Sequence, residues 1–299
     1  MYARTSRSES LRISLEKVIL GQKILKIEID PKMHKLVTSN GTKRIADIQK
    51  ATEFVQKLKG ENIKNITRRN KNLIFETNNG KIILVHLKMT GQMVFVSSAG
   101  QTTVGGHPIL GLEYPNKHTY IRFFTSGGAL YYNDVRQFGY VLYFENYEQM
   151  LKNGHLGELG LEPLSDEFNF EYFSKALSKS KIGLKKMFLG GKVVVGLGNI
   201  YADEVCFRAK VLPTRAGESL NQKEQKQLFL EIKKILQRAI DQGGSSVSNY
   251  LMADGTKGNF AKEHLVYGRG LKPCLVCGNT LERTTLANRT TVFCSVCQK

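Results

Sequence analysis

Hydrophobic and polar positions follow different periods in the two halves of the chain. Near the start, Leu11, Leu15, Val18 and Ile19 recur at helical spacing within residues 9–20. This spacing predicts a short amphipathic helix. After it, the apolar residues fall into short runs typical of β-strands, namely ILKIEI, KLVTS, NLIFE, KIILVHLKM and QMVFV.

Turn signals between these runs predict two tight hairpins. Asn-Asn-Gly separates residues 73–77 from 81–85, and Ser-Gly-Gly separates residues 120–125 from 129–132. Many short strands with frequent turns indicate a β-sandwich or barrel that extends to about residue 145. The Gly-, Ser- and Thr-rich segment 97–116 is expected to form a long loop.

Helical periodicity replaces the strand pattern from about residue 147. Asn221 and Glu224 are spaced as an N-cap and capping box. They precede an apolar stripe, and Gly243-Gly244 is a stop signal after it. The stripe consists of Leu228, Ile232, Ile235, Leu236, Ala239 and Ile240. Residues 245–262 return to loop character. A β-rich half followed by a helical half predicts an α+β protein with domains of different class.

Charge narrows the class of partner. The 299 residues contain 44 Lys and Arg against 26 Asp and Glu, a formal net charge of +18. The excess is spread along the chain, since residues 1–150 hold 22 basic and 12 acidic groups and the remainder hold 22 and 14. So large a distributed charge favours an anionic partner. Nucleic acid is the leading candidate, ahead of an anionic membrane surface, a ribosome or a merely solubilising basic surface.

Membrane insertion and secretion are not expected. No apolar run approaches the roughly 18 residues of a membrane helix, and the first thirty residues lack the apolar block of a signal peptide.

Four of the five cysteines form a metal-binding pattern. Cys274, Cys277, Cys294 and Cys297 have the spacing C-x2-C-x16-C-x2-C, which lies within the zinc-ribbon range. Four thiolates leave no open position for water, so one zinc ion there would be structural. Paired disulfides and a redox role are the alternatives. Cys206 lies between Val and Phe and is expected in a core; free thiols and zinc suit a reducing cytoplasm.

The segment between the cysteine pairs is basic. It carries Arg283 and Arg289 among threonines, a composition that suits either a nucleic-acid groove or a solvated hairpin. Upstream, Gly196 and Gly198 precede Asn199 and a predicted helix. Glycines allow close backbone approach, and a helix N-terminus offers free N–H groups to a phosphate, so this turn is a candidate anion site.

Together with the cysteine pattern, this turn resembles one family. The formamidopyrimidine-DNA glycosylases and endonuclease VIII-type enzymes, which remove oxidised bases, share these features, and the formamidopyrimidine branch is the more similar. The resemblance covers roughly residues 10–299. Its further motifs lie in family order at 68–71 (RRNK), 86–91 (HLKMTG), 117–118 (KH), 134–139 (DVRQFG), 161–166 (LEPLSD), 243–246 (GGSS) and 266–269 (VYGR).

The resemblance implies a three-part architecture. An N-terminal β-sandwich is expected over residues 1–146, a helix–two-turns–helix module over 147–265 and a four-cysteine zinc finger over 266–299. The parts would grip damaged double-stranded DNA. The protein would act as a monomer in the cytoplasm, associated with the nucleoid. A zinc-ribbon protein that binds RNA or the ribosome would explain the charge and cysteines but not the remaining motifs.

The resemblance also assigns site residues by position. Met89, Arg136 and Phe138 match the side chains that fill the space left by a flipped base, and such wedges offset part of the unstacking cost. Lys71 matches a lysine that assists strand cleavage. Asn199 and Arg289 match residues that bind phosphate, and Arg289, which would lie near the lesion, is also a candidate catalytic residue. Lys185 and His118 match further DNA contacts. Glu204 matches a glutamate near the site, with either a catalytic or a structural role.

The first residues depart from the family pattern. Its members carry an N-terminal Pro-Glu, whose secondary amine attacks the sugar and whose carboxylate manages protons. Here Ala3 and Arg4 occupy the matching positions. Three interpretations follow. In the first, the protein is a glycosylase, with or without AP-lyase activity, that uses the Met1 α-amine or a water activated by Glu9 or Glu204. In the second it is an inactive relative that binds lesions, and in the third the start of the chain is altered or misassigned.

Overall fold

A computed structural model describes residues 7–31, 37–39, 48–106, 113–153, 156, 158–242 and 259–299. The chain divides into two compact units between Glu158 and Leu159, and each unit is described separately. Among the described residues, we find no helix with the length and apolarity needed to cross a membrane.

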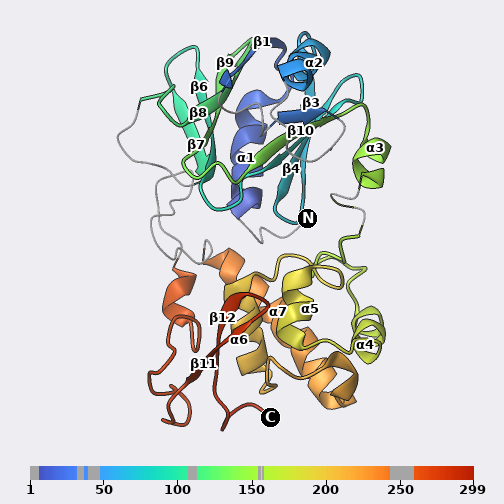
Figure 1. The fold of residues 1–299 in the computed structure, drawn as a ribbon, viewed down its shortest axis with the longest axis vertical. Coiled ribbons are helices and arrows are strands. Elements are labelled where there is room, and N and C mark those ends of the chain that lie inside the picture. The colour runs from blue at the N-terminus through green and yellow to red at the C-terminus, as the bar shows by residue number, and fades with distance from the viewer. Residues whose placement is uncertain are drawn as a thin grey trace. The chain divides into compact units, whose positions relative to one another are not determined.

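The first unit is a β-sandwich of two five-stranded sheets (Figure 1). One sheet has the order β1-β8-β9-β6-β7, with bounds Ile24–Ile29, Thr119–Thr125, Gly128–Asp134, Gly91–Ser97 and Thr102–Gly106. The other has the order β2-β10-β5-β4-β3, with bounds Val37–Ser39, Tyr140–Phe144, Ile82–His86, Asn72–Thr77 and Ile63–Arg69. All pairings are antiparallel except that of β10 with β2. The predicted sandwich is confirmed.

Two helices cover the open sides of this sandwich. Helix α1 (Arg7–Ile19) contacts the edge strands β7 and β3, and α2 (Ile48–Leu58) contacts the opposite edge strands β1 and β2. Leu11, Leu15 and Ile19 of α1 are fully buried in the core shared by both sheets, as their spacing predicts. Unpaired strand edges attract foreign strands, so covering them with helices also protects the fold. Helix α3 (Tyr147–Lys152) ends this unit.

Local turn signals predicted the hairpins better than the long loop. Strands β4 and β5 pair across Asn78-Asn79-Gly80, and β8 pairs with β9, as expected. The prediction of a loop over 97–116 is wrong in part, because Thr102–Gly106 forms β7 and pairs with β6. The glycine and threonine residues of this segment are typical of loops. The edge strand β7 nevertheless forms, because its backbone hydrogen-bonds to one neighbouring strand, β6.

The second unit combines helices with a short C-terminal hairpin. Its helices are α4 (Phe170–Ser178), α5 (Leu184–Gly190), α6 (Asn199–Arg208) and α7 (Gln222–Asp241), and its hairpin joins β11 (Glu282–Leu286) to β12 (Arg289–Phe293). The helices enclose one apolar core, and a smaller core lies around the cysteines. Cys206 is fully buried in the helical core, as expected.

Helix α7 begins where the sequence indicates. The Asn221 side chain accepts the N–H of Glu224, and the Glu224 carboxylate accepts the N–H of Asn221, which completes the predicted capping box. The predicted stripe is buried except for Ile240, which is half-buried. The predicted stop at Gly243-Gly244 and most of the 245–262 loop lie outside the described residues.

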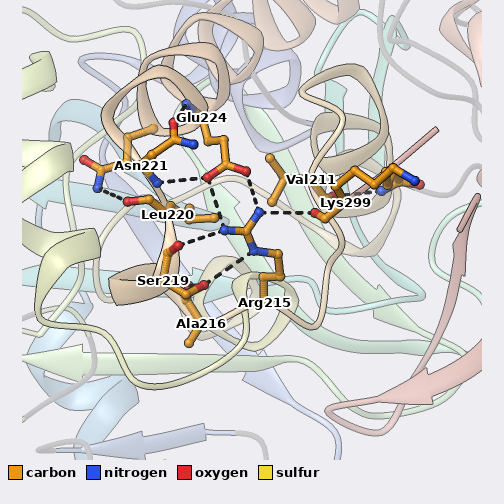
Figure 2. Close-up of polar contacts among 10 residues, drawn as sticks. Val211, Arg215, Ala216, Ser219, Leu220, Asn221, Glu224 and Lys299 are labelled. Atoms are coloured by element: carbon orange, nitrogen blue, oxygen red, sulfur yellow. Dashed lines mark hydrogen bonds and ion pairs between the residues drawn. The ribbon is translucent and has the colours of Figure 1, made fainter. Parts of the chain in front are cut away.

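Arg215 connects this capping box to the last residue of the chain (Figure 2). Its guanidinium pairs with Glu224, donates to the backbone carbonyl of Ser219 at 2.8 Å and donates to that of Lys299 at 3.3 Å. Lys299 also accepts the N–H of Leu212 and donates its own N–H to Lys210. One half-buried side chain therefore joins α7, the preceding loop and the C-terminal residue.

Arg215→Ala should lower the free energy of unfolding of the second unit by about 1–3 kcal/mol, because three acceptors lose a charged donor together. Thermal denaturation followed by circular dichroism measures this loss. The matched control is Arg238→Ala, which breaks an exposed pair with Glu263 and should cost less. Equal losses in both variants would contradict the role given to Arg215.

Candidate nucleic-acid interface

Three predicted wedge residues meet on the surface of the β-sandwich. The Arg136 guanidinium donates to the Met89 sulfur at 3.4 Å, and its central carbon lies 4.6 Å from the centre of the Phe138 ring. Met89 and Phe138 remain 52% and 42% exposed, although both are large apolar side chains. Apolar side chains that gather in one exposed patch are typical of an interaction site. The structure thus brings together Met89, Arg136 and Phe138 from two separate segments.

A tight turn after β5 raises Met89 to this position. The N–H of Gly91 donates to the carbonyl of Leu87 at 2.8 Å, and Lys88 between them has φ +50°. A Cβ atom at Gly91 would lie 2.3 Å from that same carbonyl oxygen, so only glycine fits. The turn therefore holds Met89 outward through its backbone.

A buried carboxylate organises the segment that carries Arg136 and Phe138. Asp134, at the end of β9, is fully buried and accepts the N–H of Gly139 at 2.8 Å and that of Arg136 at 3.3 Å. It also accepts the hydroxyl of Thr90, the residue after Met89, and that hydroxyl oxygen accepts the N–H of Arg136. Asp134 thus joins both wedge-bearing segments. The sequence signal for this role is the compact D-x-R-x-F-G pattern.

A row of polar and basic side chains lies next to the segment that carries Met89. Asn72, His86 and Tyr140 face one another across β4, β5 and β10, and the Tyr140 hydroxyl donates to the Asn72 side chain at 3.0 Å. Lys88 lies over the Tyr140 ring, 5.5 Å from its centre. Exposed Lys71, in the two-residue turn between β3 and β4, is close enough to influence His86 electrostatically. The sequence assigned no site role to His86 or Lys88, although both lie within three residues before Met89.

His86 is neutral at physiological pH. Burial, together with the nearby charges of Lys88 and Lys71, lowers its pKa to about 3. Its Nδ1 accepts the N–H of Lys88 at 2.9 Å, so the single ring proton resides on Nε2. The ring is thereby a fixed hydrogen-bond donor.

His118 lies close to the same segment through its backbone. Its carbonyl accepts the N–H of Asp134 at 3.1 Å, and the residue is half-buried. The sandwich therefore carries Lys71, His118 and the three wedge residues in one compact unit.

The second unit carries the predicted anion site. Helix α6 begins at Asn199, after Gly198, which has no side chain with which to cap the first N–H groups. The side-chain nitrogen of Asn199 donates to the carbonyl of Thr290 at 3.1 Å. Its buried oxygen finds no hydrogen-bond partner among the described residues. Gly196 has φ +87°, which suits the tight approach to the helix.

Lys185 does not lie where the resemblance predicted. Its side chain is fully buried, pairs with the buried Asp203 and donates to the backbone carbonyl of Asn199 at 3.2 Å. The ammonium group has no exposed surface in this structure, which does not favour the predicted direct contact between Lys185 and DNA. Burial raises the pKa of Asp203 to about 6, an effect that the Lys185 charge opposes.

Glu204 has a structural role, because it binds the backbone of residues 265–267. Its fully buried carboxylate accepts the N–H groups of Leu265, Val266 and Tyr267, each at 2.9 Å. The interpretation of Glu204 as a catalytic carboxylate is wrong, since three backbone donors occupy it and no surface reaches solvent. The structural alternative is the one that the geometry supports.

Arg289 lies at the tip of the C-terminal hairpin. Ala287 and Asn288 both have positive φ, as a two-residue type I′ turn requires, and Arg289 begins β12 with an exposed side chain. The turn thus presents the Arg289 guanidinium to solvent at a rigid position.

The four cysteines fit a tetrahedral zinc ion. Their sulfur atoms lie within 4.8 Å of one another, with Cys277 and Cys294 at 3.5 Å and Cys274 and Cys297 at 4.0 Å. Tetrahedral Zn–S bonds of about 2.3 Å place sulfur atoms about 3.8 Å apart. Zinc bound there completes the small core around Leu281 and Val292.

Met1, the remaining candidate catalytic residue, lies outside the described residues.

A β-sandwich that presents an apolar wedge within basic residues, followed by a helical unit with a helix-terminal anion site and a zinc hairpin, defines a nucleic-acid-binding protein. Family models match each part. The formamidopyrimidine-DNA glycosylase N-terminal domain matches residues 9–141, the H2TH domain of that glycosylase matches 159–250, and the zinc finger found in FPG and IleRS matches 272–299.

Curated relatives extend the match over nearly the whole chain. A formamidopyrimidine-DNA glycosylase of Heliobacterium modesticaldum is 36% identical over 97% of this chain and 98% of its own length. One from Desulfitobacterium hafniense is 37% identical over 82% and 85%. The chain therefore belongs to the formamidopyrimidine-DNA glycosylase family.

Solved structures agree with this assignment. The Lactococcus lactis Fpg in complex with DNA containing an abasic site is 32% identical, with a TM-score of 0.79 and coverage of 98% of both chains. The same Lactococcus lactis protein with DNA containing FAPY-dG gives a TM-score of 0.78.

Cys294→Ser should abolish stoichiometric zinc binding, because a serine hydroxyl does not replace the thiolate that closes the site. Metal content measured by atomic emission tests this. The matched control, Cys206→Ala, alters the cysteine of the helical core and should retain one zinc per chain. A full zinc content in C294S would overturn the four-thiolate assignment.

Asp134→Ala should loosen the wedge, since the buried N–H of Gly139 loses its acceptor and that of Arg136 keeps only the Thr90 hydroxyl. We expect a stability loss of about 1–3 kcal/mol. We also expect a smaller fluorescence rise from 2-aminopurine placed opposite a lesion, a signal that reports unstacking. The exposed carboxylate of Glu148 provides the control, E148A, which should change neither. An unchanged 2-aminopurine signal in D134A would remove Asp134 from wedge positioning.

Proposed function

We propose that this chain is a DNA glycosylase of base-excision repair that binds damaged duplex DNA, turns out an oxidised or formamidopyrimidine base and hydrolyses its N-glycosidic bond. The observation that carries the proposal is the exposed cluster of Met89, Arg136 and Phe138, held by the buried Asp134. Excision requires the base to leave the stack, and side chains inserted into the helix compensate for the lost stacking.

Phosphate contacts would come from both units. The exposed Lys71 and the half-buried His118 in the sandwich, and Asn199 and Arg289 in the second unit, are donors suited to phosphate oxygens. The net positive charge is nearly equal in the two halves of the chain, which supports this division. Phosphate groups would then compensate the basic surface of each unit. The neutral His86, with its proton on Nε2, is a further donor beside Lys71.

The reaction at the sugar has two candidate nucleophiles. The Met1 α-amine titrates near neutrality and suits Schiff-base chemistry; a water activated by Glu9 suits simple hydrolysis. Lys71 would then assist strand cleavage, if the enzyme is also an AP lyase. Glu204 is excluded as the activating base, because backbone amides occupy its carboxylate. A lesion-binding protein without catalysis is the alternative function, since Ala3 and Arg4 replace the family Pro-Glu.

We propose that the protein acts in the cytoplasm at the nucleoid, as a monomer with one duplex. Free thiols and a zinc–thiolate site suit a reducing compartment and support this proposal. We propose the same three functional segments as the sequence indicates, 1–146, 147–265 and 266–299.

Borohydride trapping separates these mechanisms. Duplexes carrying 8-oxoguanine, a formamidopyrimidine or an abasic site are incubated with protein and borohydride, which reduces a Schiff base to a stable adduct. We expect base release from the formamidopyrimidine duplex. An adduct identifies an amine nucleophile, and peptide mass spectrometry locates it; base release without an adduct identifies water.

A wedge variant and a matched control test the role of the wedge in base release. Phe138→Ala should reduce base release about tenfold or more if the wedge is required; Tyr147→Ala, which changes an exposed aromatic residue of α3, should not. Tight lesion binding without base release would establish the non-catalytic alternative. Equal affinity for damaged and intact duplex would refute the proposed function.

A further inference from the structure

The buried ion pair of Lys185 and Asp203 contacts the two segments that carry the proposed phosphate-binding residues of the second unit, Asn199 and Arg289. Both side chains are fully buried, one on α5 and one on α6. Burial of two charges has a desolvation cost that their attraction often does not recover, and an apolar pair of similar size is frequently as stable. Stability is therefore a weak reason for a buried pair at this position.

The pair has a second connection, to the zinc hairpin. One Asp203 oxygen accepts Lys185, and the other accepts the N–H of Val292 at 3.3 Å. One helical turn earlier, Asn199 donates to the carbonyl of Thr290 at 3.1 Å. Positions i and i+4 lie on one face of a helix, and alternate residues of a strand present backbone groups to one edge. The N-terminal half of α6 therefore holds the outer edge of β12 at two points.

These two points flank the functional groups. Asn199 is both a hairpin contact and the proposed phosphate ligand, and Arg289 is adjacent to Thr290 at the start of the same strand. Lys185 contributes a third restraint, because it also donates to the backbone carbonyl of Asn199 at 3.2 Å. The separation of Asn199 and Arg289 is thus set by the bond from Asn199 to Thr290 together with the bonds that meet at Asp203 and Lys185.

We propose that Lys185 and Asp203 are positioning residues that hold Asn199 and Arg289 in one frame for phosphate binding, and that Lys185 acts on DNA only through this frame. The inference rests on the proposed function. Its physical basis is the acceptor at position 203, which keeps β12 against α6; the role of Lys185 is to neutralise that acceptor in a buried environment.

Two double variants isolate the acceptor. In K185M/D203N and K185M/D203L both charges are removed, and Asn and Leu have nearly the same size. Only the first retains an oxygen that can accept the N–H of Val292. Neither leaves an unpaired buried charge, so both are expected to fold, which thermal denaturation and zinc content verify.

The readout is the dependence of binding on salt. For duplex DNA the slope of log K against log[salt] is about −0.9 per phosphate contact. K185M/D203N should keep the wild-type slope for an abasic-site duplex, whereas K185M/D203L should lose about one contact. Arg289→Ala provides the reference loss. Adding it to K185M/D203L should reduce the slope by less than it does in the wild type.

Hydrogen exchange gives a reading without DNA. The amide of Val292 should exchange faster in K185M/D203L than in K185M/D203N, while amides of the α7 core stay protected in both. A merely structural pair would raise exchange in both regions or in neither.

Two results would overturn the inference. Equal slope losses in the two double variants would mean that Lys185 contacts DNA directly, and a wild-type slope in both would mean that the hairpin position does not depend on residue 203. Failure of the proposed function gives a different result, namely wild-type protein with no preference for the damaged duplex.

Discussion

Buried carboxylates that accept backbone N–H groups are the interaction on which the second unit depends. Asp203 and Glu204 are consecutive on α6, and each binds a different part of the C-terminal segment: Asp203 holds β12, and Glu204 holds the chain just before the zinc finger. A buried charge is tolerated only when hydrogen-bond donors replace water. Only chain positions that supply such N–H donors can therefore pack against these carboxylates. This selectivity places the zinc hairpin against the helices.

The β-sandwich uses the same principle at Asp134. Its carboxylate gathers N–H groups from the segment that carries Arg136 and Phe138 and a hydroxyl next to Met89. In both units, residues suited to DNA are held by a carboxylate that is itself buried. The arrangement separates two requirements, since the contacting side chains stay exposed while their backbone is rigid. Rigid placement reduces the conformational entropy lost on binding.

Much of the fold could be predicted because its signals are local. The helix at Leu11–Ile19, the hairpins around Asn78 and Gly127 and the capping box of α7 depend on residues a few positions apart. The cysteine spacing predicted a zinc site for the same reason. The segment 97–116 differs, because the glycines around β7 are typical of loops and the strand is fixed by its pairing with β6.

The sequence by itself determined which residue types were available, namely the wedge residues, the basic groups, the four cysteines and the altered first residues. Only the tertiary structure decided their environment. Lys185 and Glu204 have the composition of a DNA contact and a catalytic acid, yet packing buries both and supplies them with partners distant in sequence. Burial and partner choice arise from contacts between α5, α6 and the zinc hairpin, which no local pattern encodes. The role of a charged residue depends on whether it faces water or an oppositely charged partner, and that is a property of the fold.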